Sequence, residues 1–412
     1  MENNMESFRA QDFWRWVEEH LNDDTTKLRL SARTDKSFDI GQAITQVECR
    51  RKYGKKFEET LHLFPQFFFP SGLACEQATS DLLAQYHQEF VDVTDNIVDM
   101  TAGLGIDAVH LARKAQKMTA IERNESLVEA LKYNCAGLGL KNITIVNEDS
   151  NVILNTLHGN VVFIDPARRA ADGTRVFSLK DCEPDVTAMY SELSNNFDRM
   201  IVKASPMLDI SHTANDLPGI TDIYVLGTKT ECKELVALVN FKKKTEETPE
   251  PIVHAVTLSK NCPAIEFTFT RTLEAEATAI IGQQQPVKGD YLFIPYPSVM
   301  KAAPVKLLSD RFEVQKFHNN THLYFGKHSD KSADFPGEAL EIIDIIPWQS
   351  KNLKKLRLTY PQAMVSVRNF GMTADQLRKK LGIKEGGNAR LRLFGIGLGD
   401  EHTDRLLILT RD

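Results

Sequence analysis

The feature that most constrains the fold is a regular alternation of short apolar runs with helical patterns between residues 96 and 204. The runs read NIVDM, MTAIE, ITIV, VVFID and RMIVKA, and helical patterns separate the first four at 106–116, 125–136 and 151–157. Strands and helices at this spacing form β-α-β units with right-handed crossovers. Such units build a parallel sheet whose two faces are both covered by helices. The sequence therefore predicts an α/β fold with a doubly wound sheet.

The chain on either side of this region has a different pattern. Before residue 92, apolar residues recur mainly three and four apart, which indicates helices. After about residue 272, strands and helices alternate in two short α+β stretches. We therefore predict four domains: a helical region over 1–92, the sheet domain over 93–272, and two small α+β domains over 273–330 and 331–412.

The composition is that of an ordinary globular protein. The chain has 412 residues, of which 42% are hydrophobic and 26% are charged, which is enough for two to four domains. The N-terminus reads as an acidic amphipathic helix, so we expect neither a signal peptide nor a transmembrane helix. The six cysteines lie far apart with no C-x-x-C pair, which argues against a zinc site or a disulfide framework. We expect a cytoplasmic protein without a bound metal.

Charge is distributed unevenly along the chain. The whole sequence carries a formal charge of −6, but residues 351–412 hold thirteen Lys or Arg against six Asp or Glu, a net charge of +7 that leaves −13 for the rest. A basic module of this kind suits a polyanionic partner such as RNA, and an ordinary solvated surface is the alternative reading.

Two glycines follow the first predicted strand and open the first helix after it. Gly103, Gly105 and Ala108 satisfy the pattern G-x-G-x-x-A of a nucleotide-binding turn. Glycine lets the backbone approach a ligand closely and directs the amides at the helix N-terminus toward it. A purely geometric turn would look the same, so the pattern alone does not decide between the two.

Acidic residues follow the next strands at the same edge of the predicted sheet. Glu122 lies 17 residues beyond Gly105, where a carboxylate can accept hydrogen bonds from ribose hydroxyls, and Asp149 ends the third strand. The glycine turn is flanked by Asp99 and Asp107, which would repel a pyrophosphate. S-adenosylmethionine (SAM) carries a sulfonium and an ammonium instead, so these carboxylates favour SAM over a nicotinamide dinucleotide.

The four motifs together resemble a known family. DMTAGLGIDA, AIERN, NEDS and DPARR, in this order and spacing, look like motifs I to IV of the class I SAM-dependent methyltransferases, whose sheet is Rossmann-like. The resemblance covers roughly 73–272. Within this superfamily, DPARR, the CEQATS helix before the first motif and the tail are similar to an uncharacterised bacterial branch of RNA methyltransferases with ferredoxin-like and THUMP-like C-terminal domains.

The resemblance implies a role for each matching residue. The methionine part of SAM would be surrounded by Asp99, Thr101, Ala102, Gly103 and Gly105. The ribose would be bound by Glu122, and the adenine by Asp149 and Ser150. The reaction edge would be formed by Asp165 and Pro166, and the preceding helix would contribute Gln77 or Thr79. Amino-methylating members often carry Asp-Pro-Pro-aromatic at motif IV, whereas this chain has Ala167 and Arg168 there. We therefore expect no adenine-amino activity.

Methyl transfer requires alignment of the two reactants and removal of a proton from the acceptor. Asp165 is the candidate proton acceptor or orienting group, with capping of the following turn as the alternative. Arg168 and Arg169 could clamp an RNA phosphate through their planar guanidinium groups, and surface ion pairing is the alternative. Lys203 lies at the same sheet edge and is a further candidate for the acceptor pocket.

Several other functions stay open at this level. Cys182 lies 17 residues past Asp165 and could be a nucleophile, but its acidic neighbours disfavour a thiolate. The aromatic stretch FPQFFFP could stack on bases or could simply be packed. The leading hypothesis is an enzyme that methylates a nucleotide of structured rRNA or tRNA. The alternatives are a methyltransferase acting on a small molecule or protein, an NAD-dependent oxidoreductase, and a non-catalytic SAM-binding protein. The sequence carries no sign of the oligomeric state.

Overall fold

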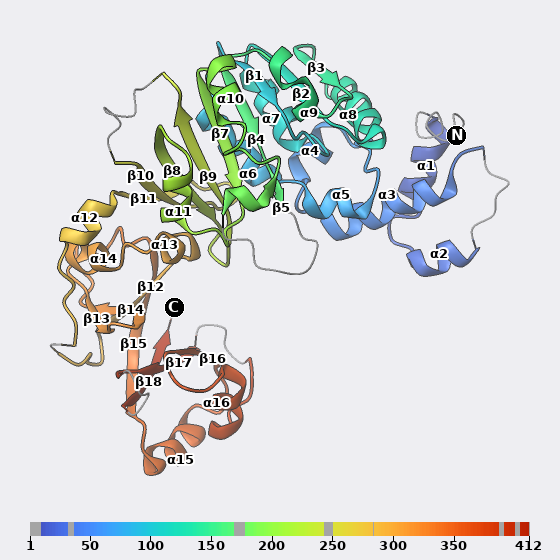
Figure 1. Ribbon diagram of the computed structural model, residues 1–412. Coiled ribbons are helices and arrows are strands. Elements are labelled where there is room, and N and C mark those ends of the chain that lie inside the picture. The colour runs from blue at the N-terminus through green and yellow to red at the C-terminus, as the bar shows by residue number, and fades with distance from the viewer. Residues whose placement is uncertain are drawn as a thin grey trace. The chain divides into compact units, whose positions relative to one another are not determined.

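The computed structural model describes residues 10–31, 37–168, 178–242, 250–282, 284–386, 391–399 and 404–411 (Figure 1). The chain divides into two compact units. The first comprises Met1–Ile223 and Leu235–Pro249, and the second comprises Tyr224–Glu234 and Glu250–Asp412. The four predicted domain ranges stay a prediction.

The first unit begins with helices, as predicted from the periodicity of its apolar residues. They are α1 (Gln11–Glu19), α2 (Thr25–Ser31), α3 (Ile40–Tyr53), α4 (Glu58–Leu63), α5 (Gly72–Gln77) and α6 (Asp81–His87), followed by a short 3-10 helix at Gln88–Phe90. Ser71 and Ser80 cap α5 and α6, because each hydroxyl accepts a hydrogen bond from a main-chain amide in the first turn.

The aromatic stretch between Pro65 and Pro70 lies in the hydrophobic core. Phe67 and Phe69 are fully buried in one cluster with residues of α3 and α5, and Phe68 packs in a second cluster against α1 and α3. These rings therefore stabilise the packing of the helices, and the structure does not present them for stacking on bases.

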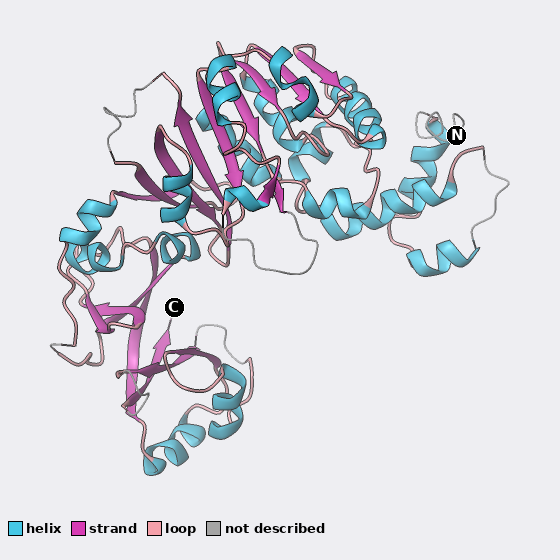
Figure 2. Ribbon diagram, in the orientation of Figure 1, coloured by secondary structure: helices cyan, strands magenta, loops and turns pink. Residues whose placement is uncertain are grey.

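Strands and helices then alternate, as the sequence predicts. The strands are β1 (Asn96–Asp99), β2 (Lys117–Ile121), β3 (Ile143–Val146), β4 (Val161–Ile164) and β7 (Arg199–Ala204). The helices are α7 (Ile106–Lys114), α8 (Glu125–Gly137), α9 (Ser150–Ile153), α10 (Tyr190–Asn196) and α11 (Ile210–Asp216), with 3-10 helices at Leu154–Thr156 and Leu179–Asp181 and a small hairpin of β5 (Ala167–Arg168) and β6 (Cys182–Glu183). Helices flank the strands (Figure 2), and every residue of β4 is buried, as expected for a covered parallel strand.

These strands form the parallel part of a nine-stranded sheet with the order β11-β10-β8-β9-β7-β4-β1-β2-β3. The remaining members are β8 (Ile220–Gly227), β9 (Cys232–Asn240), β10 (Ile252–Thr257) and β11 (Ile265–Phe269). Strand β1 pairs in parallel with both β2 and β4, so the strand order reverses direction between β1 and β4. In open α/β sheets, ligands bind outside the carboxyl ends of the strands at such a reversal. The prediction of a doubly wound α/β sheet is confirmed.

The second unit continues with a seven-stranded sheet of order β13-β14-β12-β15-β18-β17-β16. Its strands are β12 (Tyr291–Pro295), β13 (Gln315–His318), β14 (Thr321–Gly326), β15 (Gly337–Pro347), β16 (Met364–Arg368), β17 (Leu391–Gly397) and β18 (Arg405–Arg411). Its helices are α12 (Arg271–Glu276), α13 (Pro297–Ala302), α14 (Val305–Phe312), α15 (Ser350–Thr359) and α16 (Ala374–Leu381).

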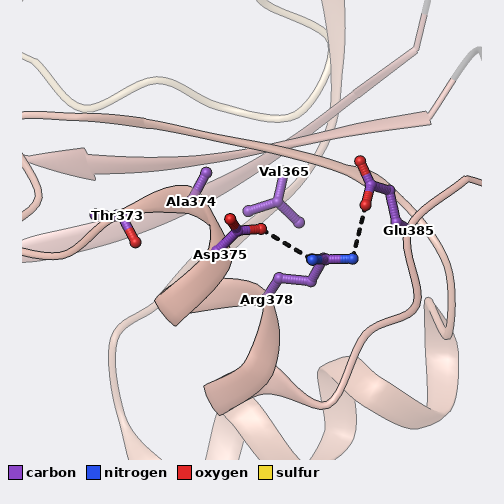
Figure 3. A pocket seen from close by; sticks show the side chains of 6 residues that line it. All are labelled: Val365, Thr373, Ala374, Asp375, Arg378 and Glu385. Atoms are coloured by element: carbon purple, nitrogen blue, oxygen red, sulfur yellow. Dashed lines mark hydrogen bonds and ion pairs between the residues drawn. The ribbon is translucent and has the colours of Figure 1, made fainter.

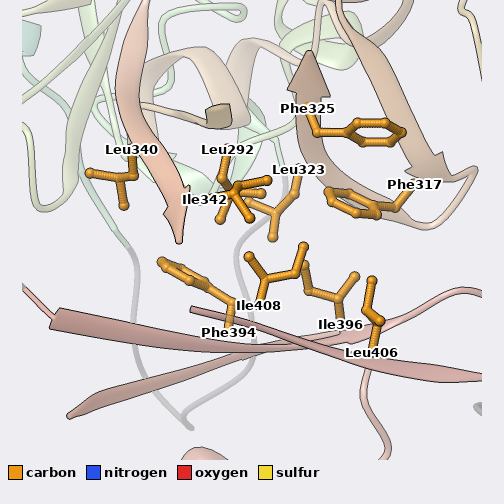
Figure 4. Close-up of a cluster of buried hydrophobic side chains, with 10 residues drawn as sticks. All are labelled: Leu292, Phe317, Leu323, Phe325, Leu340, Ile342, Phe394, Ile396, Leu406 and Ile408. Carbon is orange, nitrogen blue, oxygen red and sulfur yellow. The ribbon is translucent and has the colours of Figure 1, made fainter. Parts of the chain in front are cut away.

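The two predicted small domains share this sheet and its core. Strands β12 and β15 pair antiparallel, with Leu292 opposite Leu340. Both leucines belong to a buried cluster that also contains Phe317 and Phe325 of the β13–β14 hairpin and Phe394 of β17 (Figure 4). Because one apolar cluster draws side chains from both predicted domains, we expect 273–330 and 331–412 to stabilise each other.

Candidate functional site

The glycine turn follows β1 and is held by hydrogen bonds within the protein. Gly103 and Gly105 have φ values of 55° and 84°, a left-handed conformation that favours glycine. The Gly105 amide donates to the Ala102 carbonyl at 2.8 Å. A Cβ atom at Gly105 would lie 2.1 Å from Leu131 Cδ1, whereas one at Gly103 would meet nothing closer than 3.9 Å. Gly105 is therefore needed for packing, and the space beside Gly103 is open.

Glu122 joins the end of β2 to this turn. Its Oε2 accepts a hydrogen bond from the Gly103 amide at 2.9 Å, and its Oε1 accepts one from the Asn124 amide at 2.7 Å. The sequence indicated a carboxylate at this edge, and the structure brings it into contact with the turn. The Glu122 side chain thus shapes the same loop that we expect to contact a ligand.

Asp149 and Ser150 lie where β3 leads into α9. Asp149 is the N-cap of this helix, and its Oδ1 accepts from the Asn151 amide at 2.9 Å. Arg123 Nη1 lies 3.9 Å from Asp149 Oδ2 and 3.1 Å from Glu183 Oε1. Asp149 therefore has a structural role as a cap, and its predicted contact with adenine stays a prediction.

Asp99 ends β1 and is almost completely buried, with 1% of its surface exposed. Its Oδ1 accepts a hydrogen bond from the Thr101 amide at 2.9 Å. Burial raises the pKa of Asp99 to about 8, and the carboxylates of Asp107 and Asp165 act in the same direction, while the Thr101 amide and Lys203 act against it. Burial therefore favours the protonated form of Asp99 at neutral pH.

Asp165 follows β4 at the neighbouring strand end. Its main-chain amide donates to Thr101 Oγ1 at 2.8 Å, which ties the fourth motif to the glycine loop. Its side chain is 43% exposed, and Lys203 Nζ donates to Oδ2 at 2.8 Å. Asp165 thus presents a partly open carboxylate next to the glycine loop at the reversal point of the sheet. The adjacent Pro166 is buried.

Lys203 lies at the centre of a buried polar group that sequence reasoning did not find. We call this group the lysine cluster; its members are Thr79, His87, Asp107, Asp165 and Lys203. Besides Asp165, Lys203 Nζ donates to Thr79 Oγ1 at 2.6 Å and to Asp107 Oδ2 at 3.0 Å. His87 Nδ1 lies 2.7 Å from Asp107 Oδ1, and the Thr79 hydroxyl donates to Asp107 Oδ2.

Asp107 is ionised within this cluster. Burial acts to raise the pKa of Asp107, but Lys203 and His87 outweigh it and hold the pKa well below its usual value. Its charge is therefore balanced by protein groups, and Asp107 does not supply the ligand-facing negative charge that its position beside the turn suggested. A second buried pair lies next to it on the same two helices: His110 Nε2 of α7 is 3.1 Å from Asp81 Oδ1 of α6. The signal available in the sequence is that α6 and α7 each carry an Asp and a His on an otherwise apolar face.

The remaining predicted residues lie apart from this cluster or are not described. Gln77 is exposed at the end of α5, and Ala102 is buried in the glycine loop. Arg168 lies in β5, where its backbone alone is described, and Arg169 lies outside the described residues. Cys182 is buried in β6, which fits a packing role better than nucleophilic attack.

The basic tail is only partly available to a polyanion. Arg378 of α16 forms ion pairs with Asp375 at 2.9 Å and Glu385 at 2.8 Å, beside a cavity of about 310 Å³ that Val365 also lines (Figure 3). By contrast, Lys351, Lys354, Lys355 and Arg357 of α15 and Lys379 and Lys380 of α16 are exposed. The lysines of α15 are therefore better candidates for binding a phosphate backbone than Arg378.

Neither a membrane span nor a metal centre was found in the described part of the chain. None of its helices combines the length and apolar character that crossing a membrane requires. No group of three or more His, Cys, Asp or Glu side chains in the same described ranges is arranged to hold a metal ion.

Three family descriptions match consecutive parts of the chain. Conserved hypothetical protein 95 matches 77–178, a ferredoxin-like domain matches 291–336, and a THUMP domain-like description matches 337–411. The first covers the helix before the glycine turn, the turn itself, Glu122, Asp149 and Asp165.

Similar proteins are methyltransferases. Over 162 residues the chain is 37% identical to ribosomal RNA small subunit methyltransferase J of Brucella anthropi. The match covers 34% of this chain and 79% of the relative. The chain is 28% identical over 95 residues to an uncharacterised RNA methyltransferase of Mycoplasma mobile, and spans only 26% of that relative. A proposed methyltransferase of Porphyromonas gingivalis W83, known from its crystal structure, has a TM-score of 0.83 and 27% identity, with 97% of each chain covered.

These matches and the sheet with its glycine turn define the class of protein. The chain belongs to the class I SAM-dependent methyltransferases, in a branch that carries ferredoxin-like and THUMP-like domains on the C-terminal side. The resemblance seen in the four sequence motifs is thereby confirmed.

Proposed function

We propose that this protein transfers a methyl group from SAM to a nucleotide of structured RNA, either rRNA or tRNA. The observation that carries the proposal is the convergence of the glycine turn, Glu122 and Asp165 at the reversal point of the sheet. The names of the relatives from Brucella anthropi and Mycoplasma mobile support RNA as the substrate.

The groups around the glycine turn suit SAM better than a dinucleotide. A pyrophosphate needs unengaged main-chain amides and nearby cations. Here the Gly103 amide already donates to Glu122, the Gly105 amide donates to Ala102, and the side chains at the neighbouring strand ends are carboxylates. Glu122 still has acceptor capacity for ribose hydroxyls, and the open space at Gly103 admits close approach of a ligand.

Asp99 suits the cationic end of this ligand. An ammonium or sulfonium close to its carboxyl would favour the ionised form and lower the high pKa that burial imposes. SAM would therefore be held by Asp99, Gly103 and Glu122, and on the adenine side by Asp149 and Ser150. When bound, it supplies a methyl group on positively charged sulfur, which is activated for displacement.

Among the described side chains, Asp165 is placed to act on the methyl acceptor. The acceptor atom forms the new bond to the methyl carbon as the carbon–sulfur bond breaks, and its proton passes to the Asp165 carboxylate. The main-chain hydrogen bond to Thr101 fixes the position of Asp165, and its partial exposure leaves room for a substrate. Alignment and proton removal together account for the catalysis that such a displacement needs.

The second unit is proposed to bind the RNA. Residues 351–412 carry a net charge of +7, and α15 exposes Lys351, Lys354 and Lys355. Such exposed lysines contribute sequence-independent affinity for phosphates, and their contribution falls with salt.

Mass spectrometry of nucleosides tests this function directly. Ribosomal and transfer RNA from a strain lacking the protein should lack one methylated nucleoside, and the wild-type gene should restore it. A copy with Asp165→Asn should not restore it, although the variant is present at a normal level. Identical nucleoside profiles in the deletion strain and its parent would contradict the proposal.

A further inference from the structure

Lys203 has no donor to spare for a substrate. Its ammonium group has three N–H bonds, and three acceptors surround it: Thr79 Oγ1 at 2.6 Å, Asp165 Oδ2 at 2.8 Å and Asp107 Oδ2 at 3.0 Å. The side chain is only 5% exposed. An RNA phosphate would have to displace one of these acceptors, so a direct grip on the substrate is disfavoured.

Lys203 and Asp165 differ in exposure, so the lysine cluster has a buried side and a side that is open to solvent. Lys203 approaches Asp165 from the buried side, whereas Asp165 itself is 43% exposed. Lys203 thus anchors one carboxylate oxygen, Oδ2, from the buried side. In the described part of the chain no hydrogen bond engages Oδ1, which can face the methyl acceptor. A buried ammonium also needs compensation for its lost hydration, and Asp107 supplies it at 3.0 Å.

Resting on the proposed function, we propose that Lys203 is a positioning residue of the methyl transfer, which acts by holding the Asp165 carboxylate in place. Asp107 is its counter-charge. Thr79 and His87 hold Asp107 in turn, through the Thr79 hydroxyl and through His87 Nδ1 at 2.7 Å. Because ionised Asp107 only accepts hydrogen bonds, His87 Nδ1 carries a proton.

The cluster connects the site to several parts of the first unit. Thr79 precedes α6, His87 ends α6, Asp107 is in the first turn of α7, Asp165 follows β4 and Lys203 is in β7. Four other residues of the cluster thus support the carboxylate of Asp165, which meets the requirement that a catalytic group be held by its own supporting contacts.

A double-variant experiment separates this role from a merely structural one. The proteins compared are the wild type, Lys203→Met, Asp165→Asn and the double variant, with total RNA from a strain lacking the protein as methyl acceptor. We expect kcat to fall by roughly 100-fold in each single variant, within the usual range for a lost proton acceptor. If Lys203 acts through Asp165, kcat of the double variant stays within about threefold of Asp165→Asn alone. Multiplied losses would overturn the role, as would wild-type activity in Asp165→Asn.

SAM affinity and a milder substitution complete the test. Calorimetric SAM affinity of Lys203→Met should stay within about threefold of the wild type, since the proposed role concerns Asp165 rather than the cofactor. If Lys203→Met does not fold, Thr79→Val removes one hydroxyl of the cluster and should lower kcat about tenfold, and Thr79→Ser should restore it. No loss in Thr79→Val, or no rescue by serine, would count against the proposal. Lys117→Met, which removes an exposed lysine from the start of β2, is the control.

The two proposals fail in different ways. If the wild-type protein transfers no methyl group to this RNA, the proposed function is wrong. If it does transfer one and the losses in the double variant multiply, the function stands and the role of Lys203 is wrong.

Discussion

Replacing Asp99 by asparagine should stabilise the protein, and the gain should grow with pH. Burial raises the pKa of Asp99 from its ordinary value of 3.8 to about 8. Between these values the unfolded chain has lost the proton while the folded protein retains it, so the wild type becomes less stable as pH rises. Asparagine is neutral throughout, and its Oδ1 can still accept the hydrogen bond that the Thr101 amide donates to Asp99.

The size of this effect follows from the shift in pKa. One pKa unit corresponds to about 1.4 kcal/mol, so a shift of about four units amounts to on the order of 5 kcal/mol once the pH exceeds 8. From pH 5 to pH 8 the wild type should lose about 4 kcal/mol relative to the variant. Above about pH 9 the difference should be constant, because Asp99 is then ionised in both states.

Urea unfolding followed by circular dichroism at pH 5 to 9 measures this difference. Comparing wild type and variant at each pH cancels the titration of all other groups. Asp181→Asn, which changes an exposed carboxylate, should show no such trend. A difference between wild type and Asp99→Asn that does not vary with pH would refute the reasoning about burial.

Three further changes test the turn and the basic tail. Gly105→Ala should lower the free energy of unfolding by about 1–3 kcal/mol, because its φ is 84° and its Cβ would lie 2.1 Å from a buried leucine. Gly103→Ala, whose Cβ has space, should lose less stability, and thermal melting of both variants measures the difference. Equal losses would speak against the packing argument. Glu122→Ala should weaken SAM binding at least tenfold in calorimetry, and unchanged affinity would remove Glu122 from the site. The double change Lys354→Glu and Lys355→Glu should weaken RNA binding at low salt without altering SAM affinity, and unchanged filter binding would favour a plain solvated surface.

The central sheet was predictable because local patterns determine it. The first three short apolar runs are each followed by a helical pattern, and right-handed crossovers then leave little choice of topology. The strands after β7 were harder to place. Strand β9 pairs antiparallel with β7, and an apolar run has the same composition whichever way it pairs, so its direction and its place between β7 and β8 depend on tertiary packing.

The polar residues at the strand ends could be placed from the sequence, whereas the contacts within the buried lysine cluster could not. That Glu122 and Asp165 lie at one edge of the sheet was predictable, because the carboxyl ends of parallel strands meet there. Asp107 was misread as facing a ligand, since nothing local reveals that Lys203, 96 residues away, balances its charge. In the tail, the count of basic residues likewise does not show that Arg378 is engaged by Asp375 and Glu385.

The most direct test of the account is a crystal structure of the intact protein with S-adenosylhomocysteine, the product that SAM leaves behind. We expect its ribose hydroxyls on Glu122 and its amino acid end beside Gly103 and Asp99, with Asp165 facing the position of the lost methyl group. A product bound elsewhere, or a crevice that stays empty while calorimetry shows no binding, would contradict the central claim.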